Sequence, residues 1–222
     1  MKTLITGGTV VTAIDTMDAD VLIDGEQVVA IAAPGSHEWA DAADTVIDAT
    51  GKFVVPGGVD PHTHMQLPFG GTYAADSFET GSRAAAWGGT TTIVDFAVQV
   101  KGESLIDGFD TWMAKAEGNC AIDYGFHMIA GEINEQSLAD MDVLNERGCT
   151  SFKLFMAYPG VFYSDDGEIL RAMQKAAATR SMIMMHAENG MAIDVLREQA
   201  LERGETDPVY HSITRPSLTE SE

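Results

Sequence analysis

The sequence predicts an α/β protein in which a small β-sandwich-like subdomain precedes a (β/α)8 TIM-type barrel, of which the chain holds about five βα units. Three observations lead to this prediction. Short β-rich runs divided by glycine turns fill the first ~50 residues, strands and helices alternate after Gly57-Gly58, and the strands recur about every thirty residues, the length of one βα unit. Such alternation requires a parallel sheet, either an open doubly wound sheet or a closed barrel.

Residues 1–54 form the predicted β subdomain. They contain short β-rich runs and turn signals but no long helical period. The runs are Leu4-Ile5, Val10-Val11, Val21-Leu22-Ile23, Val28 to Ile31 and Val46-Ile47, and the turns are Gly7-Gly8, Asp24-Gly25 and Gly51. A sheet of this size is too small to stand alone comfortably, so we treat it as a subdomain.

Residues 55–222 form the predicted barrel portion, in which strand and helix patterns alternate. The predicted strands lie near Gly58–Asp60, Thr90–Phe96, Ile122–Ile129, Ser151–Phe155 and Met182–His186. The predicted helices are Phe78–Trp87, Leu105–Glu117, Leu138–Arg147, Glu168–Thr179 and Ala192–Arg203. Gly88 and Gly148 stand where glycine commonly ends a helix.

The number of units predicts a truncated barrel. A complete barrel has eight units and ~250 residues, and the residues after Gly57 fill only about two-thirds of that length. The last segment, Thr214 to Glu222, resembles the start of another capped helix. We therefore expect the chain to be the N-terminal part of a longer protein.

Composition argues against some classes of partner. The chain has 34 acidic and 13 basic residues, a formal charge of −21, so it does not attract nucleic acid phosphates or anionic lipid by charge. The N-terminal residues lack a signal-peptide pattern, and no run approaches the ~18 apolar residues that span a bilayer. We expect a cytoplasmic protein without nucleic-acid or membrane partners. Cys120 and Cys149 lie far apart and are expected to be reduced, buried thiols.

The strongest chemical signal is the segment Asp60-Pro61-His62-Thr63-His64. Two histidines at positions i and i+2 of an extended segment project to the same side, so both imidazoles can bind one metal ion. Pro61 keeps the residue before it extended. A histidine pair of this spacing also occurs by chance, but this pair follows the first predicted strand, where barrel active sites are built.

Two further candidates are Lys153 and His186. Lys153 lies in an apolar strand, where a lysine is costly unless it is paired or modified. It either extends its amine to solvent at the strand end or is carbamylated, which would make it an anionic ligand able to bridge two metals. His186 ends another strand, a position that is often only structural. With His62 and His64, these residues lie at the carboxyl ends of three predicted parallel strands, and closure of the sheet would bring them to one rim.

Other polar residues are interpreted as structural. Asp95 is expected to form local hydrogen bonds, and His127, within an apolar strand, is expected to be a hydrogen-bonded core histidine. His211 follows a helix rather than a strand, which disfavours it as a metal ligand. The run Met182, Met184 and Met185 is expected to be core packing.

These signals lie within segments that resemble the amidohydrolase superfamily and, within it, the dihydropyrimidinases and D-hydantoinases. The similar segments are Val55–His64, Leu67–Thr72, Ala75–Gly81, Gly88–Thr92, Ser151–Tyr158 and His186–Gly190. They occur in family order along nearly the whole chain, so chance similarity is excluded as their explanation.

The resemblance implies a hydrolase that opens cyclic ureides, 5,6-dihydropyrimidines and 5-monosubstituted hydantoins, to N-carbamoyl amino acids at a binuclear metal centre. By this resemblance His62 and His64 bind one divalent ion, N6-carboxylated Lys153 bridges both ions, and His186 binds the second. Zinc is the expected metal. Tyr158 is implied to stabilise the oxyanion. The resemblance implies no residues that bind a cofactor other than the metal ions.

The resemblance also implies two loops, Met65–Tyr73 and Ala157–Tyr163, that shape the pocket for the substrate's ring substituent. Two family ligands, a His expected soon after Glu222 and a later Asp that shuttles protons, have no counterpart in the chain. This departure leaves the activity of the 222 residues alone in question. Homotetramers are typical of the family, so a homo-oligomer is expected.

Two alternatives remain open. Allantoinases and dihydroorotases share the fold and the histidine pair, but dihydroorotases usually place an arginine two residues after the second histidine, where this chain has Gln66 near Leu67 and Phe69. An uncharged pocket favours dihydropyrimidines or hydantoins. The second alternative is a non-catalytic relative that serves as a scaffold, or an inactive fragment, and the retained candidate ligands argue against the scaffold.

Overall fold

The computed structural model describes residues 1–35 and 38–221 of the chain, which divides into two compact units, Met1–Gly57 and Gly58–Glu222. The sequence places the division slightly earlier, between residues 54 and 55. Each unit has its own hydrophobic cluster. No helix among the described residues is long and apolar enough to cross a membrane.

The first unit is a curved five-stranded sheet with a short helix. The strands are β1 (Lys2–Val11), β2 (Thr16–Asp24), β3 (Gln27–Ala32), β4 (Thr45–Asp48) and β5 (Phe53–Val54), and the helix is α1 (Trp39–Ala42). They are ordered β3-β2-β1-β4, with β5 also paired to β1. Asp20 is buried and accepts hydrogen bonds from Thr6 Oγ1 at 2.8 Å and Gly7 N at 3.0 Å, where the ladder of β1 and β2 shifts register.

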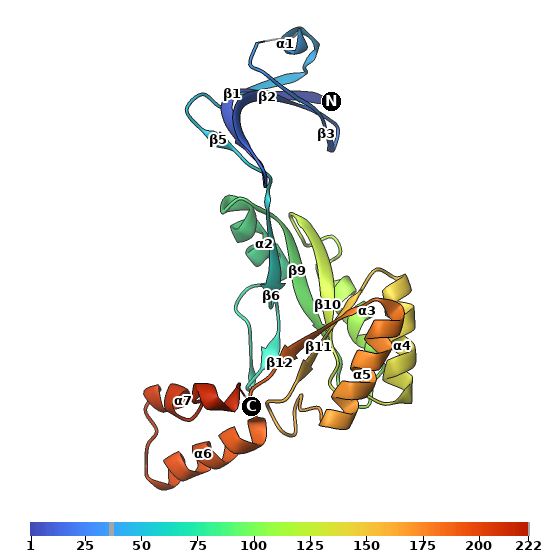
Figure 1. Cartoon of the computed structure of the whole chain (residues 1–222), viewed down its shortest axis with the longest axis vertical. Helices are drawn as coiled ribbons and strands as arrows, with labels where there is room; N and C mark the ends of the chain where they lie inside the picture. Colours follow the sequence, from blue (N-terminus) through green and yellow to red (C-terminus); the bar gives the residue numbers. More distant parts are fainter. Residues whose placement is uncertain (36–37, 222) are drawn as a thin grey trace. The chain divides into compact units, whose positions relative to one another are not determined.

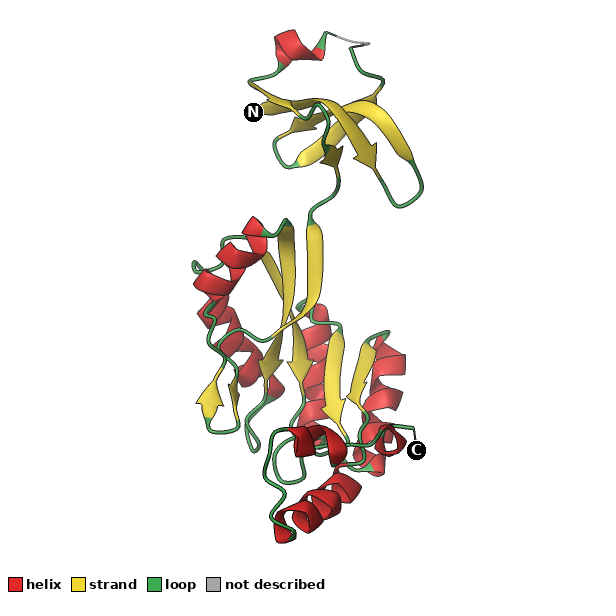
Figure 2. Cartoon of the chain, turned by 90° about the vertical axis from the view of Figure 1, so that its left-hand side faces the viewer, coloured by secondary structure: helices red, strands yellow, loops and turns green. Residues whose placement is uncertain are grey.

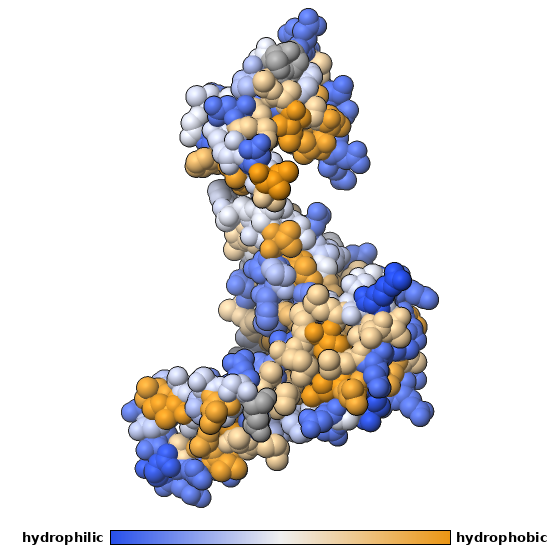
Figure 3. Space-filling view, in the orientation of Figure 1, coloured by the Kyte–Doolittle hydropathy of each residue, from blue (hydrophilic) through white to orange (hydrophobic). Residues whose placement is uncertain are grey.

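Several apolar side chains of the first unit remain exposed. Val28, Val29 and Ile31 on β3 are about half exposed, as are Val46 and Ile47 on β4. Figure 3 shows apolar residues at the surface of this unit. The buried cluster here is small, since it consists of Val10, Ala19 and Val21 with three partly buried neighbours.

The second unit contains a five-stranded parallel sheet covered by helices (Figures 1 and 2). Its order is β12-β11-β10-β9-β6. The strands are β6 (Gly58–Thr63), β9 (Thr90–Val98), β10 (Asp123–Ile129), β11 (Ser151–Phe155) and β12 (Met182–His186). The helices between and after them are α2 (Phe78–Trp87), α3 (Leu105–Ala116), α4 (Glu135–Glu146), α5 (Asp166–Thr179), α6 (Gly190–Glu202) and α7 (Val209–Ile213). A short hairpin, β7 (Pro68–Phe69) and β8 (Thr72–Tyr73), and a 3-10 turn, Ser217–Thr219, complete it.

This curled parallel half-barrel of five strands, with a separate strand-rich N-terminal part, confirms the predicted fold class. The predicted strands and helices are all present. Helix α4 begins three residues earlier than predicted because Asn134 and Ser137 form a capping box at its start. Helix α5 begins at Asp166 for the same reason, since Asp165 caps it together with Glu168.

The core of the second unit lies between the sheet and its helices. Its fully buried side chains come from strands and helices alike, among them Ile93, Phe96, Met128, Met141 and Phe152. The prediction for the methionine run was partly wrong. Met184 and Met185 pack against this core, but Met182 is 62% exposed, because it opens β12, the outermost strand of the sheet.

Met141 and Val143 on helix α4 provide a stability test. Met141 is fully buried, so Met141→Ala is expected to lower the free energy of unfolding by about 2–5 kcal/mol through lost packing and a residual cavity. Val143 is 42% exposed on the same helix, and Val143→Ala is expected to change it by under about 1 kcal/mol. Urea unfolding followed by circular dichroism measures both, and equal losses would contradict the assigned core.

Cys149 makes stability depend on alkaline pH. It is buried, as predicted, and burial raises the pKa of its thiol to about 11, although hydrogen bonding to Ser151 and the charge of Arg147 act in the opposite direction. Cys120 is only partly buried. Between pH 9 and 11 the unfolded chain loses the Cys149 proton and the folded chain keeps it, so the contribution is present below pH 9 and is lost as pH rises.

We therefore expect the free energy of unfolding of the Cys149→Ala variant to fall less than that of the wild-type chain as the pH rises above 9. The wild-type chain should lose up to about 3 kcal/mol more than the variant between pH 8.5 and 11. Paired urea unfolding curves at the two pH values measure this difference. Parallel losses in the two proteins would show that Cys149 ionises as readily folded as unfolded.

Candidate functional site

The five predicted site residues line one hollow beside the carboxyl ends of the strands. Its volume is about 280 Å³, close to the lower end of small-molecule pockets. The lining residues are His62, His64, Leu67, Phe69, Phe96, Ile129, Lys153, Phe155, Tyr158, Phe162 and His186. The structure therefore brings together side chains from β6, β11 and β12 and from the segment after β11, as the predicted rim requires.

His62 and His64 face each other edge to face, with ring centroids 5.1 Å apart. Both rings lie against Phe96 of β9, at 4.7 Å and 4.9 Å between centroids. Partial desolvation lowers the pKa of His64, and the positive charges of His62 and Lys153 act in the same direction. The neutral imidazole that results is the form that binds metal ions.

Lys153 projects from β11 into the same hollow. Its Nζ lies 5.6 Å from the ring centroid of Phe96 and 5.2 Å from that of Phe155. Within the part of the chain that the structure describes, no carboxylate forms an ion pair with it. Burial lowers the pKa of the amine. Lys153 is thus an unpaired, half-buried amine, rather than a surface lysine that reaches solvent.

His186 ends β12 and contacts one carboxylate and two aromatic rings. Its Nε2 lies 2.5 Å from Glu188 Oε2, and its ring is 5.4 Å from that of Tyr158 and 5.7 Å from that of Phe155. Glu188 was not among the site residues predicted from the sequence. Its position two residues after a strand-end histidine was the available signal.

Tyr158 has a left-handed backbone conformation, with φ of 58°. This conformation is unfavourable for a non-glycine residue, and the turn that follows compensates for it, because the Tyr158 carbonyl accepts bonds from Val161, Phe162 and Tyr163 N–H groups. The turn aims the phenol ring beside His186. Backbone strain at a pocket residue is typical of a functional position.

The two predicted loops meet through aromatic side chains. Phe69 lies 5.3 Å from Tyr158 and 6.4 Å from Phe162, between ring centroids. Phe69 belongs to the β7–β8 hairpin, and the other two rings belong to the segment after β11. This side of the hollow is therefore apolar, and none of the described residues that line it carries a charge that would bind a substrate carboxylate.

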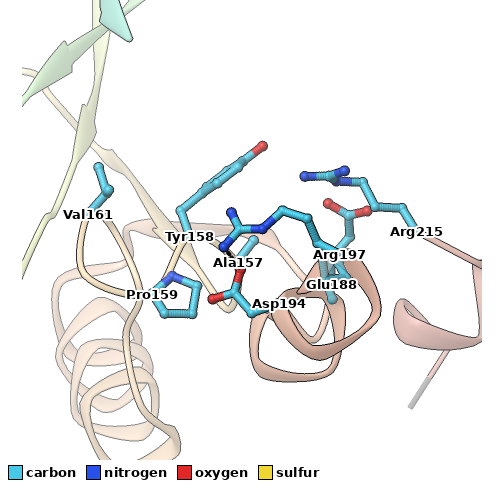
Figure 4. Close-up of a pocket in the computed structure, with 10 residues that line it drawn as sticks. Ala157, Tyr158, Pro159, Val161, Glu188, Asp194, Arg197 and Arg215 are labelled. Atoms are coloured by element: carbon cyan, nitrogen blue, oxygen red, sulfur yellow. Dashed lines mark ion pairs between the residues drawn. The ribbon is translucent and has the colours of Figure 1, made fainter. Parts of the chain in front are cut away.

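A second hollow of about 170 Å³ shares a lining residue with the first, and Figure 4 shows the side chains that line this second hollow. Tyr158 lines both. In the second hollow Arg197 pairs with Asp194 at 3.3 Å, and Arg215 and Glu188 also line it. Positive and negative side chains balance there, whereas the first hollow holds the imidazoles and the unpaired amine.

The donor groups of the first hollow include three imidazoles and one amine. Among residues 1–35 and 38–221, no three His, Cys, Asp or Glu side chains are grouped closely enough to hold a metal by themselves. The three imidazoles are good zinc ligands, and the remaining donor is the lysine. An unpaired amine of lowered pKa is suited to reaction with carbon dioxide, and the carboxylate so formed would complete the set. With that modification the donor types in the hollow would be ones that divalent metal ions such as zinc accept.

The other polar residues, with Asp95 a partial exception, are placed as interpreted from the sequence. His211 lies on α7 beside Arg215 and does not line the first hollow. Asp95 departs in part from that interpretation: only the bond from Phe96 N is local, and its carboxylate also accepts hydrogen bonds from Thr63 Oγ1 and Met65 N, which lie 32 and 30 residues earlier in the chain. His127 is hydrogen-bonded through both ring nitrogens.

Comparison with known proteins gives consistent results. The amidohydrolase family matches residues 53–212. The D-hydantoinase of Streptomyces coelicolor is 66% identical over 222 residues, which are 100% of this chain and 48% of that protein. The D-hydantoinase of Geobacillus stearothermophilus is 49% identical, over 100% of this chain and 46% of that protein.

The fold is similar to solved structures of the same group. The dihydropyrimidinase from Brevibacillus agri superposes with a TM-score of 0.93 at 50% identity, over 99% of this chain and 47% of that one. D-hydantoinase from a Bacillus sp. AR9 superposes with a TM-score of 0.91 at 51% identity, over 98% of this chain and 46% of that one. The chain spans about half the length of these relatives. Because the family match extends over most of its length, the chain belongs to the amidohydrolase family.

Proposed function

We propose that this chain carries most of the metal-binding and substrate-binding side chains of an enzyme that opens cyclic ureides. The substrates would be 5,6-dihydropyrimidines and 5-monosubstituted hydantoins, and the products N-carbamoyl amino acids. The observation that carries the proposal is the convergence of His62, His64, Lys153 and His186 on one hollow, in a chain that is 66% identical to a D-hydantoinase.

In this proposal two divalent metal ions, which we take to be zinc, supply a nucleophile at neutral pH and polarise the scissile carbonyl when bound. His62 and His64 would hold one ion and His186 the other. Lys153 would become N6-carboxylated: its neutral amine forms a bond to the carbon of carbon dioxide and releases one proton. The lowered pKa of Lys153 supports this step, because only the neutral amine reacts.

Tyr158 would act on the reacting carbonyl. Its O–H donates a hydrogen bond to the oxygen on which negative charge develops, and its backbone turn holds the ring in place before substrate arrives. Phe69, Leu67 and Phe162 would surround the ring substituent and exclude water from that side. We also propose a cytoplasmic homotetramer, in keeping with the family resemblance.

A chimera tests the proposed function. Residues 1–222 would be joined to the part of the Streptomyces coelicolor D-hydantoinase that this chain does not match. We expect the purified chimera to contain close to two zinc ions per chain and to hydrolyse dihydrouracil and a 5-monosubstituted hydantoin. A folded chimera that binds zinc but opens neither ring would refute the substrate class, and one that binds no zinc would refute the metal centre.

A further inference from the structure

Strand β6, which contains His62 and is followed directly by His64, pairs irregularly with its neighbour. Strand β6 pairs with β9, but the register shifts between Asp60 and Thr63, the interval that contains His62. Pro61 lies in this interval and has no N–H to donate to a ladder. The position of residues 61–65, here called the histidine segment, therefore depends on contacts other than regular sheet pairing.

Asp95 supplies the contacts to the residues that follow His62 in the chain. Its Oδ2 accepts hydrogen bonds from Thr63 Oγ1 at 2.8 Å and Met65 N at 2.7 Å, and its Oδ1 accepts from Phe96 N at 2.8 Å. The side chain is fully buried. Asp95 therefore links the residues that flank His64 to the backbone of β9, and both carboxylate oxygens are used as acceptors.

His127 supplies the contact before His62. Its Nε2 lies 3.0 Å from the carbonyl oxygen of Pro61, and its Nδ1 lies 2.5 Å from Ser151 Oγ. A carbonyl only accepts, so Nε2 must carry the proton that it donates. Desolvation lowers the pKa of His127, and the neutral ring then accepts from Ser151 at Nδ1. His127 thus links the histidine segment to Ser151 of β11, which lies two residues before Lys153.

We propose that His127 and Asp95 are positioning residues for the metal ligands, which hold the backbone before and after His62 so that both imidazoles face the hollow. The inference rests on the proposed function. Together the two side chains connect β6 with β9, β10 and β11, three strands that bear or adjoin the candidate ligands. Residues that orient ligands in this way typically raise metal affinity 10–100-fold.

A general loss of stability would also weaken metal binding, so the test needs a matched control. Asp140 is as deeply buried as Asp95, and its two carboxylate oxygens accept from Leu105 N at 2.9 Å and Gln136 Nε2 at 2.7 Å. It lines neither hollow. Asp95→Asn and Asp140→Asn each replace one acceptor oxygen by a donor, but only the first change affects the histidine segment.

The variants Asp95→Asn, His127→Phe, His127→Gln and Asp140→Asn would be made in the chimera. Zinc affinity would be measured by competition with a chromophoric chelator, and stability by urea unfolding. We expect Asp95→Asn and His127→Phe to lose about 10–100-fold in zinc affinity. Asp140→Asn should retain the affinity despite a similar loss of stability. His127→Gln should keep most of the zinc affinity that His127→Phe loses, because the glutamine amide can still donate a hydrogen bond to the Pro61 carbonyl.

Unchanged affinity in Asp95→Asn and His127→Phe, or an equal fall in Asp140→Asn, would overturn the inference. Hydrogen–deuterium exchange of residues 60–66 in the metal-free protein gives a second, independent readout. Faster exchange in Asp95→Asn and His127→Phe than in Asp140→Asn supports the positioning role, and equal exchange overturns it. If the unaltered chimera binds no zinc, the proposed function fails, and the exchange measurement still decides the role of the two residues.

Discussion

Replacement of Lys153 by alanine is expected to lower kcat/KM of the chimera toward dihydrouracil by at least about 10³-fold, because metal-assisted activation contributes several kcal/mol to the barrier. In the proposed function the carboxylated amine of Lys153 is the anionic ligand that the two ions share. Its loss should also lower the zinc content well below two ions per chain. Steady-state kinetics and metal analysis of the same preparation measure both effects.

Lys175→Ala is the matched control. Lys175 lies on helix α5, where it pairs with Asp142 at 2.5 Å, and it lines neither hollow. We expect that variant to keep its zinc and its activity within about twofold, since partly exposed ion pairs contribute little. Full activity of Lys153→Ala would rule out Lys153 as a metal ligand.

Tyr158→Phe is expected to lower kcat by about 10²–10³-fold with little change in KM. The phenyl ring preserves the contacts with Phe69 and His186 but removes the O–H that would donate to the developing oxyanion. An interaction made only in the transition state changes kcat and kcat/KM equally. Initial-rate kinetics over a range of dihydrouracil concentrations separate the two constants.

Tyr124→Phe serves as the control for removal of a phenol hydroxyl from this unit. Tyr124 lies on β10 and lines neither hollow. Its variant should match the parent in both kinetic constants. If Tyr158→Phe instead raised KM and left kcat intact, Tyr158 would contribute to binding rather than to transition-state stabilisation.

The sequence predicted the elements of the second unit well because local signals mark them. Helix α2 runs from Phe78 to Trp87 as predicted, with Ser77 capping its start and Gly88 following its end. Strands β11 and β12 have the predicted bounds, and each is a short run of mainly apolar residues. The rim of candidate ligands followed from parallel strands, whose carboxyl ends lie at one edge of the sheet.

Contacts between distant segments could not be predicted in the same way. The interaction of His127 with the Pro61 carbonyl depends on where two strands lie relative to each other across β9, which no local pattern encodes. The register shift in β6 and the contact between His186 and Glu188 likewise depend on tertiary geometry. Exposure of Met182 was missed because an apolar residue does not reveal whether its strand lies inside the sheet or at its edge.

The ring of Phe96 lies within 6 Å of His62, His64, His127 and the Lys153 amine. Four polar side chains, carried by three strands and the residue that follows one of them, thus surround one aromatic ring. Substitutions among them should be strongly non-additive, because each change alters the support available to the others. Position 96 should accordingly accept fewer kinds of side chain than a core position of equal burial, such as Phe152. The neighbours of Phe152 are apolar and can repack around a different side chain.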